Sequence, residues 1–108
     1  MSANFKPGVF VPEAGQLWYL CLYTAGQSPK SLQALTNLKR LCEAHLAGRY
    51  EIEVIDLVEH PSLAKIDDIL AIPTLVRRRP APTRKVVGDL SNTGRVLDGL
   101  RLQPAAGP

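Results

Sequence analysis

The sequence lacks any apolar run of the roughly 20 residues that a membrane-spanning helix needs. Its first fifteen residues have no basic leader and no long apolar stretch ending in small residues, so we expect no secretory signal and a cytoplasmic protein. Cysteine is scarce, and neither Cys21 nor Cys42 has a His or Cys neighbour at the spacing of metal ligands. We therefore expect no metal, no cofactor and two reduced cysteines in the core.

Positive charge is concentrated in one part of the chain. The formal net charge is +3, and five of the thirteen Lys and Arg residues fall between residues 77 and 85. The other eight are outnumbered by ten acidic residues, so the basic character is local. Such a cluster can indicate nucleic-acid binding, but no aromatic residue lies near it and no recognition motif surrounds it. A surface for an acidic protein partner, or a solvated edge, is favoured instead.

The first half of the chain has clear secondary-structure signals. Residues 17–23 are rich in aromatic and aliphatic side chains and predict a buried strand. A helix should follow, with Ser28 as N-cap, Pro29 at its first position and leucines recurring at three- and four-residue steps up to Gly48. Residues 50–56 alternate apolar and acidic side chains and predict a second strand. Together these elements predict a parallel βαβ unit.

The second half is less decisive. Residues 60–70 have a shorter helical pattern, residues 72–74 interrupt an apolar segment with a proline, and residues 84–88 suggest a short strand. A last helix is predicted between residues 91 and 102, although two internal glycines weaken it by about 1 kcal/mol each. We expect residues 17–102 to form one α/β domain, between a flexible N-terminal arm (1–16) and a disordered tail (103–108).

The order of the predicted elements resembles that of a thioredoxin-like domain. In that fold a cis X-Pro bond commonly precedes the third strand, and Ile72-Pro73-Thr74 stands at that place. The redox activity does not follow, because a thioredoxin needs Cys-x-x-Cys at the start of the first helix. Here that position reads AGQSP, so a thioredoxin-like oxidoreductase is disfavoured.

Longer motifs point to a narrower family. The segments LYTAGQSPKSLQALTNLKRL, YEIEVIDLVEHPSLAKIDDILAIPTL and RKVVGDLSN closely resemble the circadian-clock family KaiB, and the match extends over residues 17–102. The resemblance implies a non-enzymatic protein that binds the N-terminal ATPase ring of KaiC and opposes KaiC phosphorylation, partly by capturing KaiA. It also implies exchange with the thioredoxin-like sensor domain of a clock histidine kinase.

The same resemblance implies a metamorphic protein with two folds. One is an unliganded βαββααβ ground state, typically a homotetramer, and the other is a βαβαββα thioredoxin-like monomer that binds KaiC. Two folds of one sequence coexist only when they differ by a few kcal/mol, and the indecisive second half is where such a balance is plausible. Tetramer formation would stabilise the first fold and KaiC binding the second.

Five residues are candidates for the fold switch: Pro73, Gly88, Asp89, Gly99 and Arg101. Pro73 is expected to be cis in the KaiC-binding fold. Gly88 and Asp89 suit a turn before the last helix, with Asp89 or Ser91 as its cap, although an ordinary turn needs no more than this. Arg101 replaces an acidic residue common in the best-known members. Because a cation near a helix C-terminus favours the helix by some tenths of a kcal/mol, we expect a higher share of monomer.

Five residues are candidates for partner binding: Tyr50, Thr74, Arg77, Arg84 and Lys85. The three basic ones match basic family positions, although a solvated charge is an equal alternative for each. Tyr50 begins a strand whose exposed edge could accept a partner strand. Cys21, Glu53 and Asp68 stand where lysine is common in the family, and Glu51 together with Glu53 makes the strand acidic. These differences point away from the standard KaiA and towards a divergent paralogue with its own KaiC homologue.

The alternative function is a sensor or adaptor module related to the input domain of the clock histidine kinase. On either interpretation the expected partners are proteins: a KaiC-type ATPase, a KaiA-like protein or clock kinase as competitor, and further copies of the chain. Neither nucleic acid nor a membrane is an expected partner.

Overall fold

The computed structural model describes residues 17–102, so the predicted arm (1–16) and tail (103–108) lie outside the described residues. The elements follow in the order β1 (Trp18–Thr24), α1 (Pro29–His45), β2 (Tyr50–Asp56), η2 (Pro61–Lys65), β3 (Thr74–Arg79), β4 (Arg84–Val87) and α2 (Thr93–Leu100). This is the expected thioredoxin-like order, with the short 3-10 helix η2 in place of a second α-helix.

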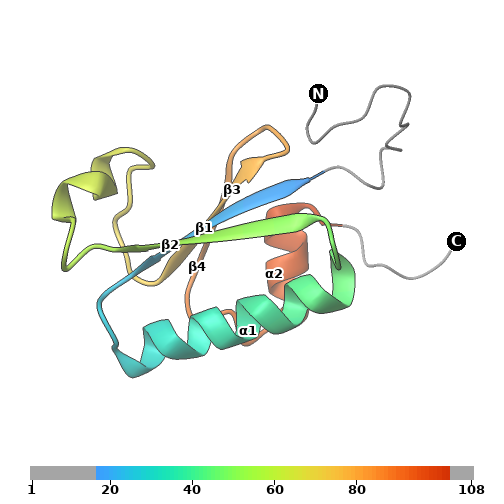
Figure 1. Ribbon diagram of the computed structural model, residues 1–108, viewed down its shortest axis with the longest axis horizontal. Helices are drawn as coiled ribbons and strands as arrows, with labels where there is room; N and C mark the ends of the chain where they lie inside the picture. Colours follow the sequence, from blue (N-terminus) through green and yellow to red (C-terminus); the bar gives the residue numbers. More distant parts are fainter. Residues whose placement is uncertain (1–16, 103–108) are drawn as a thin grey trace, which may run out of the picture.

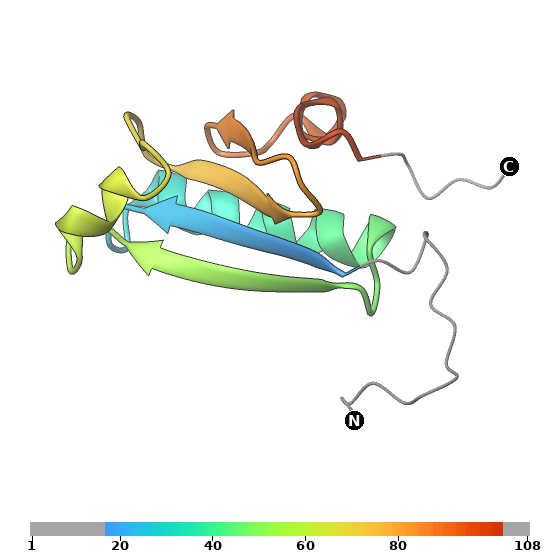
Figure 2. The ribbon, with the colours of Figure 1, turned by 90° about the horizontal axis from the view of Figure 1, so that it is seen from above.

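The four strands form one sheet in the order β2-β1-β3-β4 (Figure 1). β1 and β2 are parallel and are joined by α1, which confirms the predicted βαβ unit, while β3 and β4 add antiparallel to β1. Figure 2 shows α1 running behind the strands, with α2 beside the β4 end of the sheet. β2 and β4 are therefore the two edges, and the second half of the chain supplies one of them.

Both faces of the central strand β1 are buried, which explains its continuous apolar sequence. Trp18, Leu20 and Leu22 join a core cluster with α1 and α2. The alternate residues Cys21 and Tyr23 join a second cluster, beneath the segment 57–69. Because side chains alternate across a strand, a strand buried on both faces needs apolar residues at every position.

Helix α1 begins and ends close to where the sequence indicated. The Ser28 side chain accepts a hydrogen bond from the Ser31 N–H at 3.3 Å, and Pro29 occupies the first helical position. The helix ends at His45, and Gly48 has a φ of +76°, the left-handed conformation expected of it. The N-cap and the left-handed glycine are therefore confirmed.

The prediction of a helix over residues 60–70 is wrong beyond Lys65. Only residues 61–65 are helical, as a 3-10 turn, and Asp68 has a left-handed φ of 55°. Ile66 and Leu70 are exposed, so the apolar spacing in this segment was not the buried face of a helix. Ile69 is buried in the second core cluster, and Leu63 and Ala64 pack against that cluster. The Asp67 carboxylate bonds to Tyr23 of the sheet, which holds this segment in a non-helical path.

The predicted cap of the last helix is also wrong. Helix α2 begins at Thr93, and the Asn92 side chain, not Asp89 or Ser91, accepts a hydrogen bond from the Arg95 N–H at 3.0 Å. The buried Leu90 has a left-handed φ of 63°, so the chain cannot be helical at that point. Asp89 instead accepts a hydrogen bond from the Ser91 N–H at 3.0 Å, which closes the turn before the helix.

Candidate partner-binding surface

The peptide bond between Ile72 and Pro73 is cis, as the sequence predicted, and the Arg79–Pro80 and Ala81–Pro82 bonds are cis as well. The Pro73 carbonyl accepts a hydrogen bond from the Gly88 N–H at 2.9 Å. Gly88 has a φ of +118°, a backbone conformation that residues other than glycine rarely adopt. Two of the candidate fold-switch residues are thus in direct contact, and they join the start of β3 to the end of β4.

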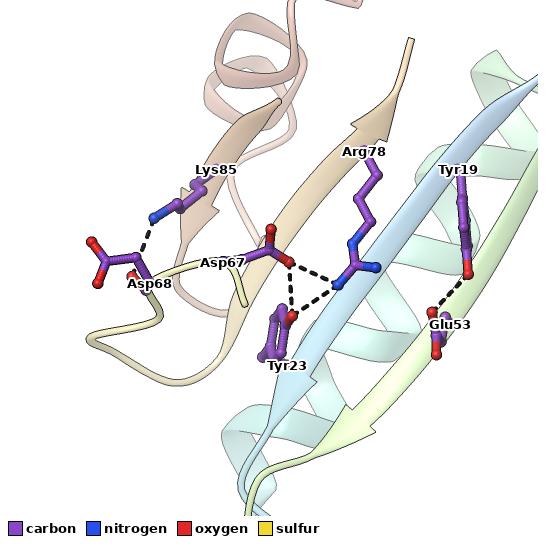
Figure 3. A network of polar contacts seen from close by, with 7 residues as sticks. All are labelled: Tyr19, Tyr23, Glu53, Asp67, Asp68, Arg78 and Lys85. Atoms are coloured by element: carbon purple, nitrogen blue, oxygen red, sulfur yellow. Dashed lines mark hydrogen bonds and ion pairs between the residues drawn. The ribbon is translucent and has the colours of Figure 1, made fainter. Parts of the chain in front are cut away.

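Exposed apolar side chains surround this contact. Leu70 is 91% exposed and Val87 is 57% exposed, and both line a shallow hollow of about 150 Å³. Ile72, which precedes the cis-proline, is 40% exposed. Lys85 lies at the rim of the hollow, where its Nζ donates a hydrogen bond to the Asp68 carbonyl at 3.2 Å (Figure 3). We call these five residues, Asp68, Leu70, Ile72, Lys85 and Val87, the cis-proline surface. It offers a protein partner apolar contact area with one cation at its edge.

Two candidate partner-binding residues are not accessible in this fold. Thr74 is 2% exposed, and its hydroxyl donates to the Ala71 carbonyl at 2.6 Å. Arg77 is 4% exposed and lies on the face of β3 that packs on the helices. In this fold both side chains bond to the chain's own backbone, and their contact with a partner stays a prediction.

Tyr50 lies at the opposite edge of the sheet from the candidates Arg84 and Lys85. Tyr50 is at the start of edge strand β2, whereas Lys85 is on the opposite edge strand β4. The Tyr50 hydroxyl donates to Glu43 Oε2 at 2.5 Å, and this bond raises the pKa of Tyr50 to about 12. Tyr50 is therefore held against α1, and the sheet separates it from the cis-proline surface.

The five clustered cations of residues 77–85 do not form one patch. Arg77 and Arg84 are cross-strand neighbours on the helix-covered face of the sheet, and Arg84 is half-buried there. Arg78 lies at an irregularity in the β1–β3 register and extends over the opposite face. Because alternate strand residues point to opposite faces, a charge run in a strand is divided between them.

A polar network that the sequence did not reveal fixes the segment after η2 to the sheet (Figure 3). The Tyr23 hydroxyl donates to Asp67 Oδ2 at 2.7 Å, and Arg78 Nη2 donates to the same carboxylate at 2.8 Å and to the Tyr23 hydroxyl at 2.9 Å. Burial, and then the bond to Asp67, raise the pKa of Tyr23 above its ordinary range. The only sequence signal for this network was the charged Arg78 in an apolar strand, and its partner Asp67 is 11 residues away in the chain.

Both cysteines of the described residues lie in the core. Cys21 and Cys42 are free and buried, and burial raises the pKa of their thiols to about 11 and about 12. Such thiols are protonated at neutral pH and are poor nucleophiles. Residues 17–102 also contain no group of three or more His, Cys, Asp or Glu side chains arranged to bind a metal ion. Within the same residues, no helix combines the length and apolar character required to span a membrane.

Comparison with models of protein families shows to which family the chain belongs. Residues 21–102 match the model of the KaiB domain. The chain belongs to the KaiB family. It is 47% identical over 90 residues to the circadian clock oscillator protein KaiB of a Nostoc species, and the match covers 83% of each chain. It is 41% identical over 85 residues to the circadian clock protein KaiB3 of Synechocystis, covering 79% of this chain and 83% of the relative.

Solved structures place this KaiB-family chain in the thioredoxin-like fold. The N-terminal domain of Synechococcus elongatus SasA superposes with a TM-score of 0.68 and 21% identity, over 92% of this chain and 93% of that domain. Mitochondrial thioredoxin 3 of Saccharomyces cerevisiae superposes with a TM-score of 0.62 and 20% identity, over 82% of this chain and 81% of that one. At these identities the likeness shows the fold alone.

Proposed function

We propose that this KaiB-family protein is a non-enzymatic clock regulator that binds the ATPase ring of a KaiC-type protein in its thioredoxin-like fold. The observation that carries the proposal is the family match over residues 21–102, on a chain with no Cys-x-x-Cys in its sequence. A thioredoxin-like domain without its redox pair retains a surface beside the cis-proline, and that surface is free to bind a protein.

The cis-proline surface is the proposed contact for the ring. Its exposed apolar side chains, Leu70 and Val87, would be buried in a complex, and Lys85 would face an acidic group of the partner. Burial of apolar area drives most protein association, and charges at the rim add specificity. Edge strand β2 carries Glu51 and Glu53 and lies at the opposite edge of the sheet from β4. A second partner, a KaiA-like protein, would therefore bind there separately.

We also propose that the chain has a second, βαββααβ fold that assembles as a homotetramer. The βαβ unit of residues 18–56 would be shared by both folds, while β3, β4 and α2 would be rebuilt. Mass action then makes the equilibrium depend on protein concentration and on the KaiC-type partner.

A stand-alone sensor or adaptor module is the second candidate function. The likeness to the SasA N-terminal domain favours it, since that domain covers nearly the whole of this chain. The identity of 21% to that domain is well below the 47% to KaiB, so the KaiB role is preferred.

Size-exclusion chromatography with candidate KaiC homologues, with and without ATP, tests the proposal. We expect a complex to form over hours, and we expect Leu70→Ser to weaken it by about tenfold or more. Leu32→Ser is the matched control, because Leu32 is an exposed leucine on α1, away from the cis-proline surface. The ring-binding role is refuted if the chain binds none of the KaiC homologues offered.

Sedimentation of the protein alone tests the two-fold model. We expect tetramer at high concentration and an increasing share of monomer on dilution. A tetramer that persists unchanged at sub-micromolar concentration would contradict the expected excess of monomer, and a monomer at all concentrations would contradict the tetramer.

A further inference from the structure

Two arginines stand directly opposite each other in the sheet. Arg77 on β3 and Arg84 on β4 are cross-strand partners, so their side chains project from the same face. Like charges in this arrangement destabilise a sheet. Arg101, which follows α2, is close enough that its charge, like that of Arg84, lowers the pKa of Arg77, after the larger effect of burial. We call these three residues the arginine cluster.

Arg77 is fixed in place but its charge is not neutralised. Its Nη1 donates to the Leu100 carbonyl at 2.6 Å, and its Nη2 donates to the Pro82 carbonyl at 2.7 Å. The guanidinium lies over the Trp18 ring, 5.2 Å from the ring centroid. Within residues 17–102 no acidic side chain forms a hydrogen bond or an ion pair with Arg77. A buried cation without an anion is costly, because burial removes the water that would stabilise the charge.

Both members of the cross-strand pair also have unused donors. The Nε atoms of Arg77 and Arg84 are buried and have no hydrogen-bond partner. Arg84 is half-buried and Arg101 is exposed, so an ion in solution can reach the cluster from their side. An unsatisfied buried N–H costs free energy that a bound acceptor would recover.

The neighbouring Arg78 shows how the same fold treats a compensated arginine. Its Nε is likewise without a partner, but its Nη2 is paired with the Asp67 carboxylate at 2.8 Å on the opposite face of the sheet. No such carboxylate serves the arginine cluster within the described part of the chain. The cluster therefore combines three positive charges, two unused buried donors and access from solvent.

We propose that the arginine cluster binds an oxyanion of the phosphate class. Guanidinium groups are planar donors whose geometry matches phosphate oxygens, and a phosphate presents several oxygens with nearly two negative charges to the three cations. A carboxylate would supply one charge and two oxygens. This inference does not depend on the proposed binding of a KaiC-type ring.

Thermal unfolding in millimolar inorganic phosphate tests the proposal, with sodium chloride at matched ionic strength as reference. We expect phosphate to raise the midpoint of the wild type by about 3 °C or more, as a ligand of the folded state does. Arg84→Gln should abolish that rise. In chloride alone, Arg84→Gln should unfold at a higher temperature than the wild type, because it removes the repulsion from Arg77.

Lys85→Gln is the matched control, since it removes one positive charge from the adjacent position on the opposite face of β4. It should retain the full phosphate effect. Arg101→Gln provides a second cluster variant if Arg84→Gln does not fold, and it should reduce the phosphate effect.

Three outcomes would overturn the proposal. An equal effect of phosphate on the wild type and on both cluster variants would mean general salting-out, since phosphate stabilises many proteins. No difference between phosphate and chloride would mean that no site exists. Stabilisation by glutarate but not by phosphate would assign the cluster to carboxylates. The same unfolding experiment with pyrophosphate and with ATP distinguishes a site for free phosphate from one that takes a nucleotide. Stabilisation by either compound supports the phosphate class.

Discussion

Gly99 of α2 lies directly against Val86 of β4. A Cβ atom on residue 99 would lie 2.8 Å from Val86 Cγ2, closer than real Cβ contacts, so glycine is what allows α2 to pack on the edge strand. The sequence suggested that this glycine weakens the helix. The structure shows what compensates for the lower helix propensity: without a side chain at residue 99, α2 can approach the sheet.

Gly99→Ala should therefore destabilise the thioredoxin-like fold by about 1–3 kcal/mol, as overpacking does. Gly94→Ala is the matched control in the same helix, since its nearest neighbour, Asn92 Oδ1, is 3.8 Å from the added Cβ. That variant should be neutral or stabilising by about 0.5 kcal/mol. Urea unfolding followed by circular dichroism measures both. Equal effects of the two substitutions would show that helix propensity, not the Val86 contact, governs α2.

Arg101→Gly should stabilise this fold by about 0.5–1 kcal/mol. Arg101 follows α2 with a φ of 57°, the left-handed conformation in which glycine ends many helices and other side chains are strained. This strain works against the stabilising effect that the sequence suggested for a cation here. Thermal unfolding of Arg101→Gly and Arg101→Gln separates the two effects, because only glycine relieves the backbone. Equal stability of both variants would disprove the backbone explanation.

Tyr23→Phe should cost about 1–2 kcal/mol, because it removes a hydroxyl that bonds both Asp67 and Arg78 in a part-buried network. Tyr19→Phe is a close match on the same strand and face, since the Tyr19 hydroxyl donates to Glu53 at 2.7 Å but is exposed. That variant should lose little, about 0.5 kcal/mol or less. Chemical denaturation of the two variants compares them, and a larger loss for Tyr19→Phe would contradict the role given to the network.

Protonation of the Asp56 carboxylate should contribute to the loss of folding stability in acid. The N–H groups of Val58 and then Gly26 donate to its carboxylate and lower its pKa. A carboxyl with a lowered folded-state pKa stabilises the fold above its unfolded pKa of about 3.9, and the contribution disappears as the pH falls through the folded value. Asp56→Asn should flatten the loss of thermal stability below about pH 4. Parallel acid profiles for Asp56→Asn and the wild type would refute this assignment.

The sequence predicted the βαβ unit well because its signals are local. The Ser28 cap, the leucine spacing of α1 and the double-sided burial of β1 all follow from residues close together in the chain. The family resemblance supplied the overall fold and the cis bond before Pro73.

Long-range contacts explain what the sequence did not predict. The segment after η2 leaves the helical path because Asp67 bonds to Arg78, and α2 starts late because Leu90 is buried in a left-handed turn. Arg77 was taken for a surface charge because its partners, the Trp18 ring and the Leu100 carbonyl, are distant in sequence. Leu70 was assigned to a helical pattern and Val87 to a short strand, and local pattern does not show that either side chain faces solvent.

The bond from the Gly88 N–H to the Pro73 carbonyl makes one amide a reporter of the second half of the chain. A hydrogen-exchange experiment compares it with the amide of Leu38, in the interior of α1. If β3 and β4 leave the sheet while the βαβ unit stays folded, the Gly88 proton exchanges and the Leu38 proton does not. The ratio of the two exchange rates then measures opening of the second half separately from global unfolding, without any partner present.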